Sequence, residues 1–169
     1  MSVDPAASIE VGVLVERRPP DTHWAEHVWA ATELLLDVPD VPGWTLLRQE
    51  GPHKVYFAGR AEIRLFRTET DNLRHNMESR EPRIWAVLRP TDGDPGMALQ
   101  CVTADPGEAH LYADSGNDLV ESLAMPAPLA AAIRAFIAKH HVAQTHHKRR
   151  RDRADPEAMA RPVWEAEDE

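Results

Sequence analysis

The sequence predicts an α+β fold, in which two or three short helices pack on a mostly antiparallel sheet. Three observations point to this class. Short stretches of alternating apolar and polar residues recur between positions 9 and 104, as in half-buried strands. Fourteen prolines in 169 residues favour short elements and turns over long helices. One apolar stripe, around position 133, has helical spacing instead. A sheet of this kind can also curl into a half-open barrel.

Strands are expected where the alternation is clearest. The first covers 9–17, with Ile9 and the valines that follow on one face. The stretch 28–36 suits a strand, although a helix starting near Thr22 would also accommodate its leucines. Three short strands separated by Gly-containing turns then suggest an antiparallel meander. These are 44–48, 54–58 and 62–66, and two more strands are predicted at 84–88 and 97–104.

Three helices are predicted from capping residues and periodicity. The first covers 70–78 and is capped by Thr68 or Thr70. The second opens at Asp105-Pro106, a capping residue followed by proline at the first helical position, and it ends near position 114. The third runs over 126–141, and apolar residues at 129, 133, 136 and 137 predict one face docked on the sheet.

Length and composition predict a single domain over 9–142, a flexible N-terminus over 1–8 and a disordered, charged tail over 143–169. The lone Cys101 suits a reducing compartment and reads as a buried, inert thiol. We find no signal sequence and no apolar run of about 20 residues, so a cytoplasmic protein away from the membrane is expected. The net charge of −9 argues against nucleic acid as a partner.

Motifs for catalysis or cofactor binding are missing from the sequence. There is no Gly-x-Ser-x-Gly elbow and no glycine-rich phosphate loop. Of the nine histidines, the adjacent pairs His140-His141 and His146-His147 cannot chelate together, because neighbouring side chains on a helix diverge. His140 continues the apolar face of the last helix and is expected to cap the core. We therefore predict no catalytic residue, no cofactor and no metal, and the chain is more readily a binding protein than an enzyme.

The densest polar stretch is 67–76, followed by Arg80. One interpretation is structural, with ion pairs between Arg67 and Glu69 and between Arg74 and Asp71. The other is a recognition patch that holds a carboxylate, a phosphate or an acidic segment of a partner. The candidate residues of this patch are Arg67, Glu69, Thr70, Arg74, Asn76 and Arg80.

A basic run in the tail is the second candidate contact. Such a run is either simply solvated or acts as a docking arm, disordered alone, that folds against an acidic partner or anionic nucleic acid. Trp164, in an acidic stretch, is a candidate hydrophobic anchor. The basic residues of the run are Lys148, Arg149, Arg150, Arg151 and Arg153.

Several segments together resemble a bacterial family of the DUF3305 type, a domain of unknown function. They are VGVLVERR at 11–18, LFR at 65–67 with Glu69 and Thr70, RHN at 74–76, IWAVLR at 84–89, VTADPGEA at 102–109 with Tyr112, Met125-Pro126, and His140-His141 leading to KRRRDR at 148–153. The resemblance implies a gene beside formate dehydrogenase, and some members carry the label molybdopterin-guanine dinucleotide biosynthesis protein A.

That enzyme label requires a glycine-rich nucleotide loop after the first strand, whereas here the strand ends in Arg17-Arg18-Pro19-Pro20. The resemblance therefore implies a non-catalytic, chaperone-like accessory or maturation factor for a molybdenum- or tungsten-dependent formate dehydrogenase. Its partner would be a subunit of that enzyme or one of its maturation factors. Two alternatives stay open, namely a protein or enzyme that handles the molybdopterin dinucleotide, and a regulatory binding module with an unrelated partner.

Overall fold

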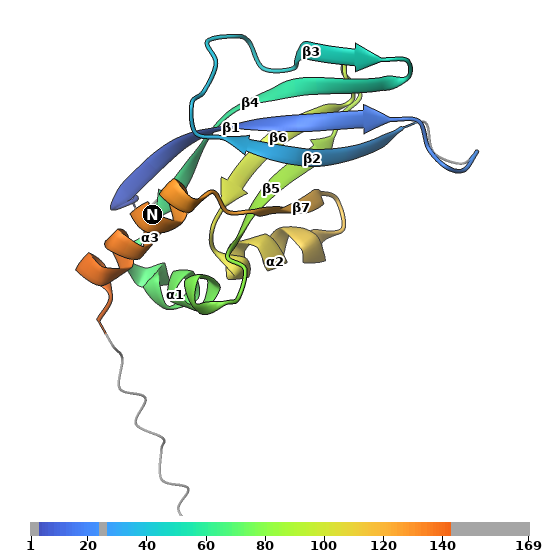
Figure 1. The fold of residues 1–169 in the computed structure, drawn as a ribbon. Helices are drawn as coiled ribbons and strands as arrows, with labels where there is room; N and C mark the ends of the chain where they lie inside the picture. Colours follow the sequence, from blue (N-terminus) through green and yellow to red (C-terminus); the bar gives the residue numbers. More distant parts are fainter. Residues whose placement is uncertain (1–3, 24–26, 143–169) are drawn as a thin grey trace, which may run out of the picture.

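The computed structural model describes residues 4–23 and 27–142, and it contains two antiparallel sheets with helices gathered at one end (Figure 1). The first sheet has the strand order β2-β1-β4-β3, and the second has the order β6-β5-β7. The strands of the first sheet are β1 (Ala7–Arg18), β2 (Val28–Leu35), β3 (Thr45–Glu50) and β4 (His53–Leu65). The strands of the second sheet are β5 (Arg83–Pro90), β6 (Met97–Thr103) and β7 (Leu119–Ala124).

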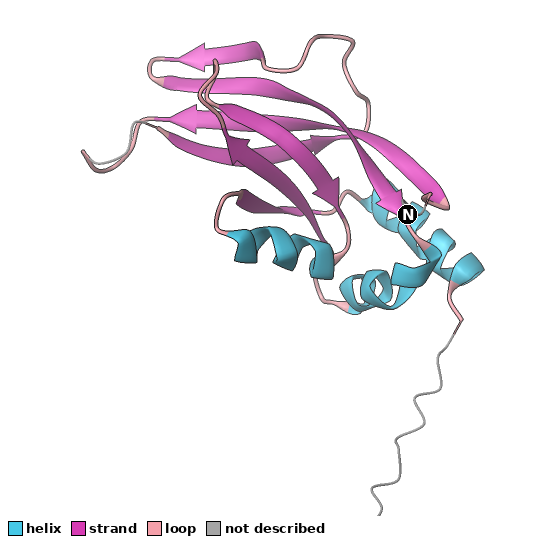
Figure 2. Ribbon diagram, turned by 180° about the vertical axis from the view of Figure 1, so that it is seen from behind, coloured by secondary structure: helices cyan, strands magenta, loops and turns pink. Residues whose placement is uncertain are grey.

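The helices are α1 (Thr70–Glu78), α2 (Pro106–Ser115) and α3 (Ala127–His140), and a 3-10 turn, η1 (Arg67–Glu69), precedes α1. Helix α2 contacts all three strands of the second sheet, while α1 packs against both α2 and α3. The first described residues lie beside α3, as the reverse view in Figure 2 also shows. The start of the chain, η1 and the end of α3 therefore share one corner of the molecule.

One hydrophobic core joins the two sheets and the helices. Alternate residues of β1 supply its first layer, with Val11, Val13 and Val15 fully buried. Ile84 on β5 and Ile133 on α3 are also fully buried and belong to the same cluster. Full burial of a side chain of this size stabilises the fold by about 1.5–3 kcal/mol. The predicted α+β class and the docked face of the last helix are confirmed.

Several finer predictions are also confirmed. The stretch 28–36 is a strand, helix 70–78 forms as predicted, and the second helix begins where its capping signal stands. Asp105 is the N-cap of α2, and its Oδ1 accepts a hydrogen bond of 2.7 Å from Gly107 N. The helix ends at Gly116, whose φ of 68° is a left-handed conformation that glycine adopts at little cost.

The predicted split of residues 54–66 into two strands is wrong, because β4 is continuous from His53 to Leu65. Val13 of β1 faces Gly59, and Leu14 faces Phe57, so Ala58 is an extra residue in the ladder. Gly59 adopts a φ of 143° at this bulge. The meander is wrong as well, since β4 pairs with β1 on its far side from β3.

The strands form two separate sheets and no closed barrel over the described ranges. Two other expectations need correction, and one strand was missed. Neither Thr68 nor Thr70 caps α1, because η1 continues directly into the helix and Glu69 occupies the N-cap position without a side-chain bond. Strand β7 had not been predicted; it pairs antiparallel with β5 at the edge of the second sheet.

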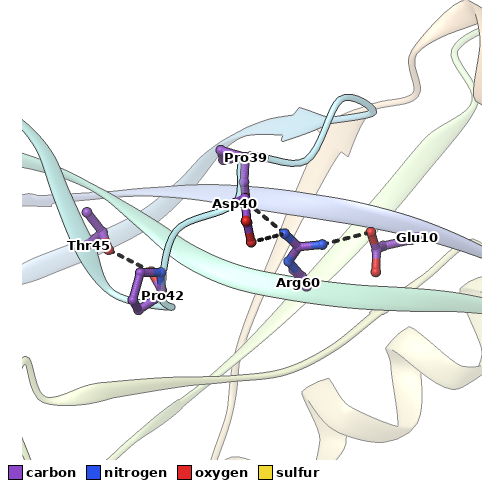
Figure 3. Close-up of polar contacts among 6 residues, drawn as sticks. All are labelled: Glu10, Pro39, Asp40, Pro42, Thr45 and Arg60. Atoms are coloured by element: carbon purple, nitrogen blue, oxygen red, sulfur yellow. Dashed lines mark hydrogen bonds and ion pairs between the residues drawn. The ribbon is translucent and has the colours of Figure 1, made fainter.

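The loop 36–44 crosses the outer face of the first sheet, and Arg60 holds it there (Figure 3). Arg60 forms an ion pair of 3.2 Å with Glu10 of the neighbouring strand. It also donates hydrogen bonds of 3.1 Å to Pro39 O and 3.3 Å to the Asp40 carboxylate. Phe57, on the same face, is fully buried. The contacts of Arg60 therefore serve the packing of this loop.

No helix in the described part of the chain is long and apolar enough to cross a membrane.

Candidate functional site

The structure separates the residues of the patch predicted from the sequence. Asn76 is only 4% exposed, and its side-chain amide forms hydrogen bonds with backbone groups. Its Nδ2 donates to Arg83 O at 2.7 Å and to Ala104 O at 2.8 Å, and its Oδ1 accepts from Arg83 N at 2.9 Å. Asn76 thereby joins α1 to the start of β5 and the end of β6, so it is unavailable to a ligand.

Arg74 forms ion pairs within its own helix, as the structural interpretation of this stretch predicted. It lies 3.9 Å from Asp71 and 3.8 Å from Glu78, at the two helical spacings that favour ion pairs on an exposed surface. Each such pair is worth about 0.3–0.5 kcal/mol. Arg80 is exposed after the end of α1 and has no ion-pair partner within the described residues.

Glu69 does not form the predicted ion pair with Arg67. Burial raises the pKa of its carboxyl, and the nearby carboxylates of Asp105 and Glu108 raise it further, while Arg64 offsets part of the effect. Glu69 therefore lies in the field of the carboxylates at the start of α2, and it has no ion-pair partner among the described residues.

Arg67 and Thr70 line a cavity of about 460 Å³ between η1 and the end of α3. We call this cavity the basic cleft. It collects side chains that are far apart in the sequence, because η1 and α3 meet at the corner described above. Its lining residues are Arg67, Thr68, Thr70, Asp71, Lys139, His140 and Val142.

Two cations of the basic cleft have no ion-pair partner among the described residues. Arg67 and Lys139 are both exposed, and within the described residues neither has a carboxylate within 4 Å. The pKa of His140 lies below its ordinary value because of desolvation and because Arg67 and Lys139 repel a third positive charge. The ring of His140 packs on Phe136 with 4.6 Å between centroids, which confirms that it caps the core.

The wall of the basic cleft is fixed by hydrogen bonds. Thr70 is buried, and its Oγ1 lies 3.2 Å from both Arg67 O and His141 Nδ1. The single acid of the lining, Asp71, lies 3.8 Å from the imidazole of His141 and 3.9 Å from the guanidinium of Arg74. These contacts tie η1 and α1 to the end of α3, so that Arg67 and Lys139 line one cavity.

A second cavity of about 390 Å³ adjoins the basic cleft. It is lined by Asp4, Ala6, Phe66, Arg67 and Thr68, so Arg67 and Thr68 are common to both cavities. We call it the apolar cup, because most of its lining surface is apolar and Phe66 and Ala6 belong to that lining. A ligand that spans both cavities meets positive charge on one side of Arg67 and apolar surface on the other.

Other side chains that could in principle react with or bind a ligand have structural roles instead. Cys101 is half-buried in β6, and burial raises the pKa of its thiol, which is the state expected of an inert cysteine. Arg17 lies 5.6 Å from the ring of Trp29 and 5.8 Å from that of Tyr56, in a cluster completed by Trp44. No group of three potential metal ligands occurs among the described residues.

Sequence reasoning identified Arg67 and Thr70 but missed Lys139. Its signal was present, because a lysine and a histidine in the last turn of an amphipathic helix are common at a polar rim. What the sequence did not show is that this turn meets η1. The tail residues Lys148, Arg149, Arg150, Arg151 and Arg153 lie outside the described residues.

Taken together, these observations define a small two-sheet α+β protein with a basic cleft at the corner where η1, α1 and the end of α3 meet. The chain belongs to the DUF3305 family, proteins of unknown function, whose family model matches residues 10–151 and so includes every lining residue of the basic cleft. No curated protein and no solved structure matches the chain.

Proposed function

We propose that this protein is a non-catalytic accessory or maturation factor that holds an acidic segment of a protein partner in the basic cleft. The observation that carries the proposal is that Arg67 and Lys139 are both exposed and both line one cavity, and neither has a carboxylate partner among the described residues. Guanidinium and ammonium groups placed in this way bind carboxylates through charge-assisted hydrogen bonds. The identity of the partner, a formate dehydrogenase subunit or its maturation factors, rests on the family resemblance given under Sequence analysis.

The lining of the two cavities supports a peptide ligand. Val142 is 79% exposed at the rim of the basic cleft, and Phe66 lines the apolar cup on the other side of Arg67. Apolar surface on both sides of the cations suits a segment in which acidic residues follow a large apolar one. The basic run that begins at Lys148 follows Val142 closely in the sequence and would add charge of the same sign.

A molybdopterin dinucleotide is the alternative ligand, because Arg67 and Lys139 would also suit phosphate groups. Of the arginines that the sequence suggested for this purpose, Arg74 is already engaged by two acids, and Arg80 does not line the basic cleft. Only Arg67 and Lys139 of these cations line the cleft without an ion-pair partner among the described residues, and we regard an acidic peptide segment as a better ligand for this pair than a dinucleotide.

The proposal is tested by purifying the tagged protein from its own host grown with formate and identifying co-eluting proteins by mass spectrometry. The wild type is compared with the double variant Arg67→Glu/Lys139→Glu and with Arg134→Glu, a matched control. Arg134 is exposed on the same helix as Lys139 but does not line the basic cleft. Each variant is first checked for an unchanged circular dichroism spectrum and melting temperature.

We expect formate dehydrogenase or its maturation factors with the wild type and Arg134→Glu, and at least tenfold less with the double variant. Equal capture by the double variant would refute the role of the basic cleft. A different co-eluting partner would refute the association with formate dehydrogenase. Stabilisation by GTP or the pterin dinucleotide that is lost in the double variant would favour the cofactor-handling alternative.

A further inference from the structure

We infer that the acidic segment 163–169 of this same chain occupies the basic cleft and the apolar cup, and so competes with the partner's acidic segment. The inference rests on the proposed function, since it assigns a second ligand to the same site.

The segment has the chemistry that the two cavities select. Trp164 is followed by Glu165, Glu167, Asp168 and Glu169, four acidic residues within the next five positions. The basic cleft offers Arg67 and Lys139 to these carboxylates. A high density of acidic residues directly beside a tryptophan occurs at this one place in the chain.

The apolar side chain of the segment has a complementary surface as well. Phe66 and Ala6 line the apolar cup of about 390 Å³, a size that accommodates an indole ring. Arg67 stands between the two cavities, where its guanidinium can contact both a carboxylate and the face of an aromatic ring. A tryptophan followed by acidic residues thus matches the two adjoining cavities, with the indole in the apolar cup and the carboxylates in the basic cleft.

Chain length allows the contact within one molecule. Val142 lines the basic cleft and is the last described residue, so the connection to position 163 starts at the site itself. Twenty residues, 143–162, lie between the two and can span up to roughly 66 Å at about 3.3 Å each. A ligand tethered in this way has an effective concentration of about 1 mM, far above that of a scarce partner.

The acids already at the site do not oppose this occupant decisively. Asp71 lines the basic cleft but lies close to both Arg74 and His141. Asp4 lines the apolar cup, where the occupant is the indole of Trp164 and not a carboxylate. The two free cations, Arg67 and Lys139, are on the side that the acidic residues would face.

Zero-length carbodiimide crosslinking of the full chain tests the contact, because it joins a lysine to a carboxylate only when the two touch. The crosslinked peptides are mapped by mass spectrometry. The chain has three lysines, and Lys54 on β4 serves as the control away from the site. We expect Lys139 joined to the acids at 165–169, at a yield that does not depend on protein concentration and is lost in 1 M salt, with no such product at Lys54.

A second measurement uses a fluorescent peptide with the sequence of residues 164–169 and the full-length variant Glu165→Gln/Glu167→Gln/Asp168→Asn/Glu169→Gln. Releasing the internal competitor should tighten binding of the added peptide by about tenfold. Trp164→Ala should give a change in the same direction. Arg161→Gln, a charge change just outside the segment, should leave the affinity unchanged.

The inference fails if Lys139 is not crosslinked to 165–169 and the neutralised variant binds the peptide no more tightly than the wild type. It also fails if mixing isotope-labelled and unlabelled protein shows that the crosslinks join two molecules, since the occupant is then a second copy. Loss of partner capture in the Arg67→Glu/Lys139→Glu variant with no internal crosslink would leave the proposed function intact and refute this inference alone. An internal crosslink without capture of any partner would refute the proposed function alone.

Discussion

Replacement of Asn76 by alanine separates the structural role found here from the ligand-binding role that the sequence suggested. Asn76 is 4% exposed and makes three hydrogen bonds of 2.7–2.9 Å to the backbone of Arg83 and Ala104. Each buried polar group left without a partner costs about 1–3 kcal/mol. The two groups of Arg83 are only partly buried, so water can replace some of the loss. We therefore expect Asn76→Ala to lower the free energy of unfolding by about 3 kcal/mol, out of a total of about 5–15 kcal/mol.

Urea unfolding followed by circular dichroism measures this loss. With a urea m-value of about 1–3 kcal/mol per molar, the midpoint should fall by roughly 1–3 M. The control is His75→Ala, an exposed position of the same helix, for which a change within about 0.5 kcal/mol is expected. The reasoning would be refuted by an Asn76→Ala variant that is as stable as the wild type yet binds the partner less well, because the side chain would then belong to a recognition surface.

Two further predictions concern the acid stability and the packing of the sheets. The guanidinium of Arg89, which donates to both carboxylate oxygens of Asp118 at 2.7 and 2.9 Å, holds the pKa of that carboxyl below its ordinary value of 3.8. The folded state therefore binds fewer protons, and this stabilisation is present above pH 3.8 and is lost as the pH falls through the lower pKa. Asp118→Asn should accordingly lower the melting temperature at pH 7 but progressively less toward pH 2, whereas an equal loss at every pH would contradict the ion-pair argument. Gly12→Ala would place a Cβ atom 2.8 Å from the ring of the fully buried Phe57, so we expect the free energy of unfolding to fall by about 1–3 kcal/mol. The control, Gly93→Ala in an open loop, should leave the thermal stability unchanged. Equal effects of the two substitutions would show that the loop over Phe57 moves to accommodate the extra methyl group.

The elements that sequence reasoning identified correctly are those defined by local signals. Asp105 followed by proline specifies the start of α2, and the stripe that includes Ile133 specifies the buried face of α3. These signals act within one or two helical turns. Strand 28–36 was identified for a similar reason, since its β-branched and aromatic residues lie together.

The elements that it missed depend on partners far away in the chain. Gly59 looks like a turn, yet pairing with β1 runs through it, keeps β4 continuous and makes the glycine part of a bulge. Strand β7 is short and lies at a sheet edge, where alternation is weak. Its existence follows from the pairing with β5.

The same distinction applies to the candidate site. The polar stretch around Arg67 was recognised because its residues are adjacent in the sequence, but the fold buries Asn76 and leaves Glu69 without an ion pair to Arg67. Lys139 joins Arg67 only through the contact between η1 and the end of α3. Composition identifies a polar stretch, whereas tertiary contacts decide which of its charges stay free.

The central claim is that the basic cleft recognises acidic segments, and fluorescence anisotropy of a labelled peptide with the sequence of residues 164–169 tests it most directly. Binding is compared for the wild type, Arg67→Glu/Lys139→Glu and the control Arg134→Glu at 50 and 200 mM salt. The account predicts saturable binding to the wild type and the control, weaker at the higher salt, and at least tenfold weaker binding to the double variant. Equal affinity of the wild type and the double variant would contradict it.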